Sequence, residues 1–290
     1  MAPTATVAPA VTEQDAPIVT KGRPQPLVSS GILDQFEQFD ATPIIGTEFS
    51  SANLALVQRL GELTGKPKTS GLHIHPILNP SQEFGGSDPE ISTISSAQRK
   101  KLYSVPEDTL WASEYELYDR IGEPYQKFLE GLTGTFAQPG FNAAAARGGF
   151  ELYDKLRGAP ENDGSSFKAV HPIVRTNPVT GWKSLFPLGN HIQYINGVTE
   201  EESKSLLSWF LDLVYKNHDL QVRLKWKNTN DIAIWDNRST FHRATFDYDG
   251  QGERFGNRAV ELGERPYYDP NSKSRREALR EHAPNEKILV

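Results

Sequence analysis

The clearest periodic segment of the chain begins at Thr199 and predicts an amphipathic helix. Glu202 follows three residues later, which is the spacing of a capping box, where each side chain bonds the backbone N–H of the other residue. Apolar residues then recur every three or four positions on one face, namely Leu206, Leu207, Phe210, Leu211 and Val214. Such a stripe serves a core or a subunit interface alike, so the pattern leaves a homo-oligomer open.

Two earlier segments carry weaker helical patterns. Residues 113–132 place apolar residues on one helical side, namely Leu117, Ile121, Phe128 and Leu129. Pro124 falls inside this segment, where a proline kinks a helix or divides it in two. Residues 137–156 are rich in glycine and alanine and predict a loop followed by a short helix.

The second half of the chain reads mainly as short strands. Residues 169–178 form a strand-like run that Asn-Pro ends, and residues 182–189 form another beyond a turn at 180–181. In residues 220–238, apolar and charged residues first alternate, which predicts a half-buried strand, a polar turn at 228–231 and then a buried strand. Many short strands with a few helices outside predict a β-barrel or a sandwich of jelly-roll type.

Composition narrows the classes of function. The 290 residues carry a formal net charge of −6, so the chain lacks the basic excess typical of a general nucleic-acid binder. It contains no cysteine, which excludes a disulfide framework, a thiolate zinc site and a cysteine nucleophile. No run approaches the roughly 18 apolar residues of a membrane span, and we expect a soluble, cytoplasmic protein.

The chain divides into three parts by composition. Residues 1–31 contain alanine, proline, threonine and valine without helical or alternating order, and we expect a disordered N-terminal tail. The periodic patterns lie in residues 32–270, which predict a single domain of adequate size for a core. Residues 271–290 are polar and are predicted to form a C-terminal tail.

The candidate chemistry gathers between residues 234 and 266. His242 is followed by Arg254 and Arg258, which are four residues apart in a strand-like run. Because side chains alternate along a strand, both guanidinium groups point to the same face and could hold one carboxylate. The alternative is that the arginines lie on the surface beside Glu261 and Glu264, and that His242 is a hydrogen-bonded structural residue.

This same region resembles a known family. The sequence NDIAIWDNRSTFHRATFDYDGQGERFGNRAVELGERP (230–266) is similar to the C-terminal signature of the taurine dioxygenase-like (TauD/TfdA) family, non-haem iron enzymes that depend on 2-oxoglutarate. HPIVRTNPVTGWKSLF (171–186) and DTLWAS (108–113) match further upstream. GLHIHP (71–76) and FLEGLTGTF (128–136) look like the fungal sulfonate dioxygenase branch. The resemblance covers about residues 32–270.

The resemblance implies a fold and a site. The fold is mainly β with peripheral helices (α+β), a double-stranded β-helix or jelly roll. Iron(II) is held by two histidines and one carboxylate, which leaves positions open for 2-oxoglutarate and O2. His242 matches the distal metal ligand, Thr109 and Arg254 match the 2-oxoglutarate-binding residues, and Arg258 matches the residue facing a small anionic substrate. No catalytic side chain is implied beyond the metal centre.

The implied reaction is the oxidation of a sulfonate such as taurine, which releases sulfite, succinate and CO2. The residues 235–238, WDNR, look structural in this family, where they set the turn that presents His242.

One part of the family pattern is missing. The other two metal ligands belong to a His-x-Asp motif, expected between the equivalents of Tyr103 and Asp108, and here only SVPE (104–107) joins those landmarks. No His-x-Asp or His-x-Glu occurs elsewhere in the sequence. A block is therefore predicted to be deleted, which implies an incomplete jelly roll.

Two alternatives to the enzyme follow from this deletion. The first is a catalytically impaired or inactive family member, arising as a shortened isoform, a truncated gene model or a pseudoenzyme that binds dicarboxylates. The second is a cupin-like metal site in which His73, His75 and Glu83 replace the missing ligands.

Overall fold

The structure is a computed structural model that describes residues 36–49, 74–76, 92–95, 108–227, 231–245 and 255–282. The predicted tail at 1–31 and the junction at 104–107 lie outside these ranges. None of the helices within them is both long and apolar enough to cross a bilayer.

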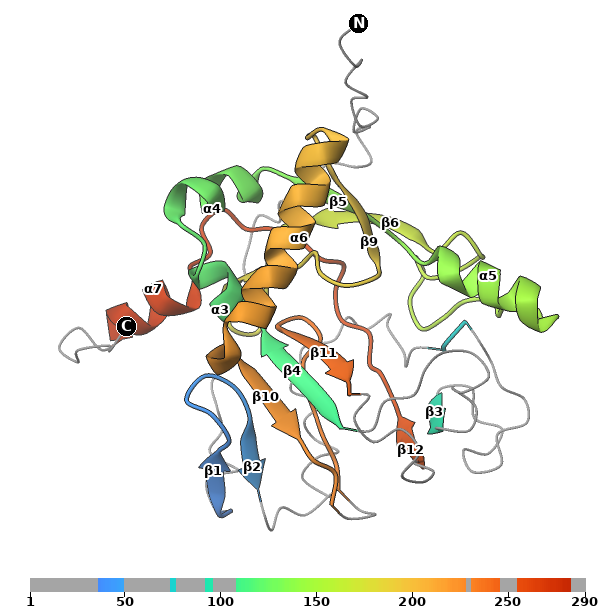
Figure 1. The fold of residues 1–290 in the computed structure, drawn as a ribbon, viewed down its shortest axis with the longest axis horizontal. Helices are drawn as coiled ribbons and strands as arrows, with labels where there is room; N and C mark the ends of the chain where they lie inside the picture. The colour runs from blue at the N-terminus through green and yellow to red at the C-terminus, as the bar shows by residue number, and fades with distance from the viewer. Residues whose placement is uncertain are drawn as a thin grey trace, which may run out of the picture.

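The strands of the described residues form five small antiparallel sheets, and the helices lie around them (Figure 1). The strands are β1 (Gln38–Asp40), β2 (Thr47–Phe49), β3 (Ser92–Ser95), β4 (Thr109–Ser113), β5 (Thr133–Ala137), β6 (Lys168–Pro172), β7 (Val174–Thr176), β8 (Lys183–Leu185), β9 (Ile192–Asn196), β10 (Gln221–Leu224), β11 (Thr240–Ala244) and β12 (Phe255–Arg258). Their orders are β1-β2, β10-β4-β11, β12-β3, β6-β5-β9 and β7-β8. The predicted sheet-based fold with peripheral helices is confirmed.

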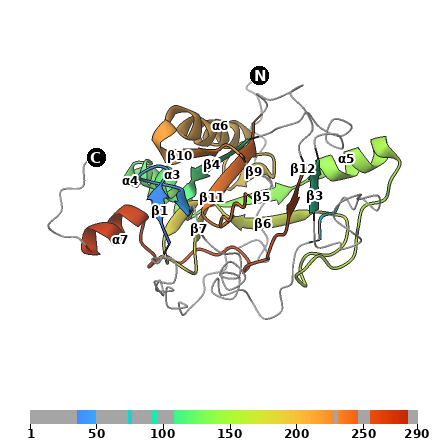
Figure 2. The ribbon, with the colours of Figure 1, turned by 90° about the horizontal axis from the view of Figure 1, so that it is seen from below.

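The helices lie on the outside of these sheets. They are α3 (Glu114–Asp119), α4 (Glu123–Glu130), α5 (Pro139–Gly148), α6 (Glu200–Lys216), the 3-10 turn η2 (His218–Leu220) and α7 (Arg275–His282). Helices α5 and α7 project at opposite ends of the molecule in both views (Figure 1, Figure 2). Hairpin β1-β2 lies against β10, since a Cβ added at Gly46 would sit 3.1 Å from Val222.

Local sequence signals account for where the helices begin and end. The capping box of α6 forms as predicted, with Thr199 and Glu202 bonding each other's backbone N–H groups. The segment 113–132 is split in two, because Gly122 caps α4 and Pro124 lies in its first turn, where a proline needs no N–H partner.

Two predicted elements differ in the structure. In residues 137–156 the helix comes first, as α5, because Pro139 suits a first turn and Gly149 ends the helix at φ 64°. The buried strand predicted before 238 is wrong: residues 231–236 form no strand, and Ile232 and Ile234 are 53% and 57% exposed. The segment pairs with no described strand, and its last residue, Asp236, instead bonds locally to form the turn before β11.

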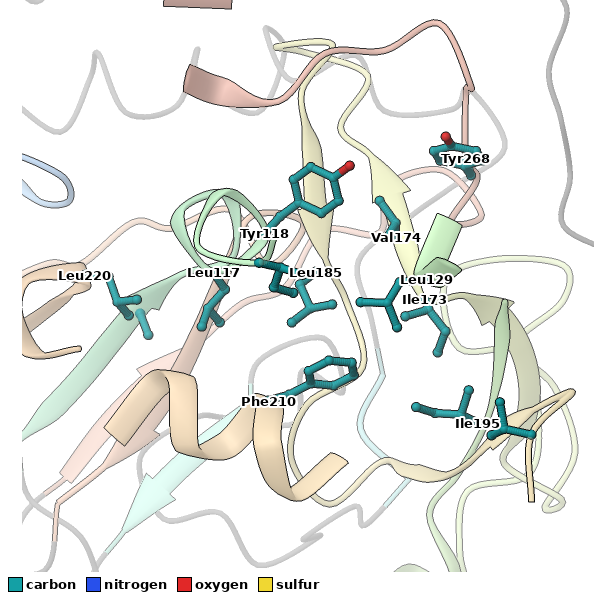
Figure 3. Packing of buried hydrophobic residues seen from close by; sticks show 13 residues of the cluster. Leu117, Tyr118, Leu129, Ile173, Val174, Leu185, Ile195, Phe210, Leu220 and Tyr268 are labelled. Atoms are coloured by element: carbon teal, nitrogen blue, oxygen red, sulfur yellow. The ribbon is translucent and has the colours of Figure 1, made fainter. Parts of the chain in front are cut away.

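The core lies between the helices and the sheets. Phe210 of α6 and Leu117 of α3 face Leu185 of β8 and Leu129 of α4, and all four are fully buried (Figure 3). Fully burying such a side chain contributes about 1.5–3 kcal/mol to stability. Ala112 of β4 belongs to this same cluster, so one face of the β10-β4-β11 sheet is turned toward the core.

The folded part of the chain extends beyond residue 270. Glu116 of α3 is buried, and its carboxylate accepts hydrogen bonds from Arg275 at 2.6 Å and Arg276 at 3.0 Å at the start of α7. The guanidinium of Arg120 lies 3.7 Å away on the same helix. These charges dock α7 onto α3, although the sequence of residues 271–282 reads as a polar tail.

Replacing Glu116 with glutamine should lower the free energy of unfolding by about 2 kcal/mol, because hydrogen bonds from charged groups to a buried carboxylate contribute amounts of this order. Urea unfolding followed by circular dichroism measures the change. Glu123→Gln is the matched control, because Glu123 pairs with Lys127 in full exposure and its loss should leave the midpoint unchanged. Equal midpoints for Glu116→Gln and the wild-type chain would show that α7 is not held by these charges.

Candidate active site

Strand β4 carries the first of the expected site residues. Side chains alternate along a strand, so Thr109, Trp111 and Ser113 share one face, while Leu110 and Ala112 share the other. Since Ala112 faces the core, Thr109 lies on the face turned away from it. Ser113 ends the strand and caps α3 by accepting a hydrogen bond from the backbone N–H of Glu116.

Strand β11 brings His242 to the same face. In the antiparallel register Ala244 lies opposite Thr109, and His242 lies opposite Trp111. Directly opposed residues of an antiparallel pair point to the same side of the sheet. The predicted metal ligand and the predicted 2-oxoglutarate-binding threonine are therefore brought together, on neighbouring strands and one face.

The hydroxyl of Thr109 is oriented by a tryptophan. The indole Nε1 of Trp226 donates a hydrogen bond to Thr109 Oγ1 at 3.1 Å. A hydroxyl has one donor and two acceptor positions, so accepting from Trp226 leaves the proton of Thr109 for another acceptor. A carboxylate placed over this face would accept it.

The imidazole of His242 is exposed and lies beside two tryptophans. Its ring centroid is 5.1 Å from that of Trp235, and the Trp235 ring is 5.4 Å from Trp111 in a T-shaped arrangement. Such aromatic pairs contribute about 0.5–1.5 kcal/mol beyond the area that they bury. The three rings therefore define one edge of the face that carries Thr109.

The turn before β11 is built by Asp236, as the sequence predicts. The Asp236 carboxylate accepts from the backbone N–H of Arg238 at 2.8 Å, and its backbone carbonyl accepts from the N–H of Thr240 at 3.1 Å. Burial opposes ionisation of Asp236, but the hydrogen bonds and charge of Arg238 outweigh it and lower the pKa of the carboxyl. Two residues beyond this turn the chain reaches His242.

A largely buried ion-pair network fixes that turn to the rest of the domain. Glu264 accepts from Arg175 at 2.7 Å and from Arg238 at 3.1 Å, and Arg238 also binds Asp236. The side chains of Arg175 and Arg238 are only 4% and 12% exposed. The network thus links β7, the turn before β11 and the segment after β12. The partners of Glu264 are these two arginines, which differs from the surface pairing with Arg254 and Arg258 considered above.

Glu114 adds a buried acid beside the network. Burial raises the pKa of this carboxyl well above its usual range, Arg175 opposes the rise, and Asp236 adds to it. The rise favours the protonated form of Glu114, so the ionic part of the network consists of two guanidinium groups and the carboxylates of Asp236 and Glu264. Its backbone N–H donates to the carbonyl of Ser239 at 2.9 Å, which joins α3 to β11.

Of the two arginines predicted from the sequence, the structure describes Arg258 and not Arg254. Arg258 is the last residue of β12, half-buried, and lies opposite Ser92 of β3 in the register. Arg254 lies outside the described residues, as do His73 and Glu83 of the cupin-like alternative. His75 is described, and its ring contacts Phe141 at 5.3 Å.

The described residues do not fit an iron site with three protein ligands. No three histidine, cysteine, aspartate or glutamate side chains gather among them in a way that could hold a metal ion. The carboxylate of Asp108, next to Thr109, is held by Arg223 at 2.8 Å, and that of Asp236 is held by Arg238. The described residues therefore form no group of three such ligands that includes His242.

Several supporting residues were missed by sequence reasoning. Trp226, two residues after β10, orients Thr109. Its alternation with Val222 and Leu224 was visible in the sequence, but the pairing of β10 with β4 was not. Arg175 and Glu264 meet across 89 positions of sequence, and no local pattern joins them.

Comparison with known proteins identifies the family of this chain. The profile of the family described as "Taurine catabolism dioxygenase TauD, TfdA family" matches residues 107–260, a range that contains β4, β11 and β12. The chain belongs to the TauD/TfdA dioxygenase family. The fold agrees as well: a taurine dioxygenase from Burkholderia xenovorans shares it with a TM-score of 0.55 at 19% identity, over 82% of this chain and 92% of that one.

Two curated TauD/TfdA relatives illustrate the range of similarity. The alpha-ketoglutarate-dependent dioxygenase btcD of Neocamarosporium betae is 39% identical, over 88% of this chain and 98% of its own length. The alpha-ketoglutarate-dependent sulfonate dioxygenase of Saccharomyces cerevisiae is 31% identical, over 67% of this chain and 46% of its own. The match to btcD spans 341 aligned positions, more than the 290 residues of this chain, so btcD carries residues without a counterpart here.

Glu114→Gln should remove a pH dependence of stability. An unfolded glutamate ionises near 4.5, whereas the buried one stays protonated to a higher pH, so the folded state binds more protons above 4.5 and stability falls as the pH rises. The variant should therefore gain more stability over the wild-type chain at pH 8 than at pH 5. Urea midpoints of both proteins at the two pH values measure this, and a gain that is equal at both would contradict a raised pKa for Glu114.

Proposed function

We propose that this chain binds 2-oxoglutarate and derives from a protein that carries out Fe(II)- and 2-oxoglutarate-dependent oxidation of a small anionic substrate. The observation that carries the proposal is the placement of Thr109 and His242 on one face of the β10-β4-β11 sheet, within the segment that the family profile matches. Sulfonates such as taurine are the first substrates to test, since the Saccharomyces cerevisiae relative is named for them.

Each residue has a role that its chemistry supports. The free proton of the Thr109 hydroxyl donates to the distal carboxylate of 2-oxoglutarate, and the guanidinium of Arg254 pairs with the same carboxylate. Arg258 binds the anionic group of the substrate. His242 is the single metal ligand of the family triad within the described residues, and O2 is the oxidant in the family reaction.

The predicted deletion between Tyr103 and Asp108 would separate ligand binding from metal binding. The described donor set does not fit iron, and relatives such as btcD carry residues that this chain lacks. Losing ligands should weaken metal binding far more than losing outer partners, which already costs about 10–100-fold in affinity. Oxidation of the substrate then belongs to a form of the protein that contains the His-x-Asp block.

A second candidate function follows from the same donor set. A chain that keeps the 2-oxoglutarate site without the metal ligands is a non-catalytic dicarboxylate-binding protein, the inactive family member of the sequence analysis. The two functions share Thr109 and Arg254, and they differ in whether iron(II) and substrate oxidation accompany binding.

Metal-free 2-oxoglutarate binding tests the part that both functions share. Arg254→Ala should raise the dissociation constant at least about tenfold, because a charge-assisted pair contributes an amount of that order. Arg243→Ala is the matched control, since Arg243 lies on β11 next to His242 but opposite Leu110, on the other face. Isothermal titration in EDTA measures both. A wild-type chain without measurable binding would contradict the proposal.

Anaerobic titration with iron(II) and 2-oxoglutarate separates the two functions. We expect no visible charge-transfer band from this chain and no sulfite or succinate from taurine. A chain with the His-x-Asp block of a relative inserted after Tyr103 should show the band and lose it in His242→Ala. A band from the present chain that disappears in His242→Ala would instead mean that other residues complete the metal site and that the block is dispensable.

A further inference from the structure

The indole of Trp111 carries a buried donor that has no partner among the described residues. Trp111 is 7% exposed, and its buried Nε1 atom meets no hydrogen-bond acceptor in that part of the chain. The neighbours that share its face do have partners, because Thr109 accepts from Trp226 and Ser113 caps α3. A buried N–H group without an acceptor is destabilising, and such groups are rare in native structures. An acceptor is therefore expected at this position.

The position of Trp111 on the sheet indicates where an acceptor would bind. Trp111 lies two residues beyond Thr109 on the same face, about 6.6 Å along the strand, and directly opposite His242. That spacing is comparable to the length of a five-carbon dicarboxylate. Trp235 contacts Trp111 from residues 231–236, which form no strand, and its indole N–H donates to Asn237 Oδ1 at 2.7 Å.

Two carboxylates near this strand are already engaged. Asp108 is held by Arg223, and Asp236 is held by Arg238 and Asn177. An indole N–H only donates, and a bound ligand can supply the acceptor that these two groups do not. An ionised carboxylate is the strongest such acceptor, because charge assistance roughly doubles the strength of a hydrogen bond.

We propose that Trp111 is a ligand-binding residue whose indole N–H donates to the keto-acid carboxylate of 2-oxoglutarate, while Thr109 binds the opposite end. The assignment rests on the proposed function, since it requires 2-oxoglutarate to bind this face. It adds that the chain holds both ends of the ligand with its own donors, so binding without a metal discriminates dicarboxylates from monocarboxylates.

Two ligands and two variants test the assignment. Levulinate carries a methyl group in place of the carboxylate next to the keto group of 2-oxoglutarate, so it keeps the carboxylate at Thr109 and lacks the one at Trp111. Trp111→Phe removes the donor and keeps a ring, and it should weaken 2-oxoglutarate binding about tenfold while leaving levulinate binding unchanged. Thr109→Val should weaken both. Trp209→Phe, on α6 beside Tyr125, is the control and should change neither. Calorimetry of the full chain in EDTA measures all four proteins.

A second measurement covers the case in which Trp111→Phe fails to fold. In the wild-type chain with 15N-labelled tryptophan, the indole N–H signal of Trp111 should shift downfield on adding 2-oxoglutarate and stay in place on adding levulinate. The assignment would be overturned if Trp111→Phe lowered the affinity for both ligands equally or for neither. The same indole shift with both ligands would overturn it as well. A wild-type chain that binds neither ligand would overturn the proposed function and this assignment with it.

Discussion

The carboxylate of Glu264 lies between two largely buried guanidinium groups, those of Arg175 and Arg238. Arginine does not lose its charge in proteins, so without this carboxylate two guanidinium groups in a poorly solvated place would share the single carboxylate of Asp236. The three side chains come from β7, from the turn before β11 and from the segment after β12. The positions of His242 and Arg258 relative to each other therefore depend on one acid that touches neither of them.

Local patterns were sufficient for elements whose determinants lie within a few residues. The capping box of α6, the division of 113–132 at Pro124 and the turn at Asp236 were all predictable, because each rests on side chains bonding to nearby backbone. The family match supplied Thr109 and His242, and the structure places them on one face.

Long-range pairing could not be read from the sequence. Residues 231–236 suggested a buried strand, but the segment pairs with no described strand and leaves Ile232 and Ile234 exposed. The bond from Trp226 to Thr109 spans 117 positions, and the docking of α7 onto Glu116 spans about 160. These contacts are properties of the topology rather than of any window of residues.

The docking of α7 also determines when the domain can be completed during synthesis. Helix α3 follows β4 directly. Its buried Glu116, however, meets Arg275 and Arg276 only when helix α7 has left the ribosome. Chains emerge at about 5–20 residues per second, and contacts of high sequence separation form late. The strand that carries Thr109 and Trp111 is thus made early and secured last. Until then the acid of its neighbouring helix has Arg120 of the same helix, at 3.7 Å, as its nearby cation.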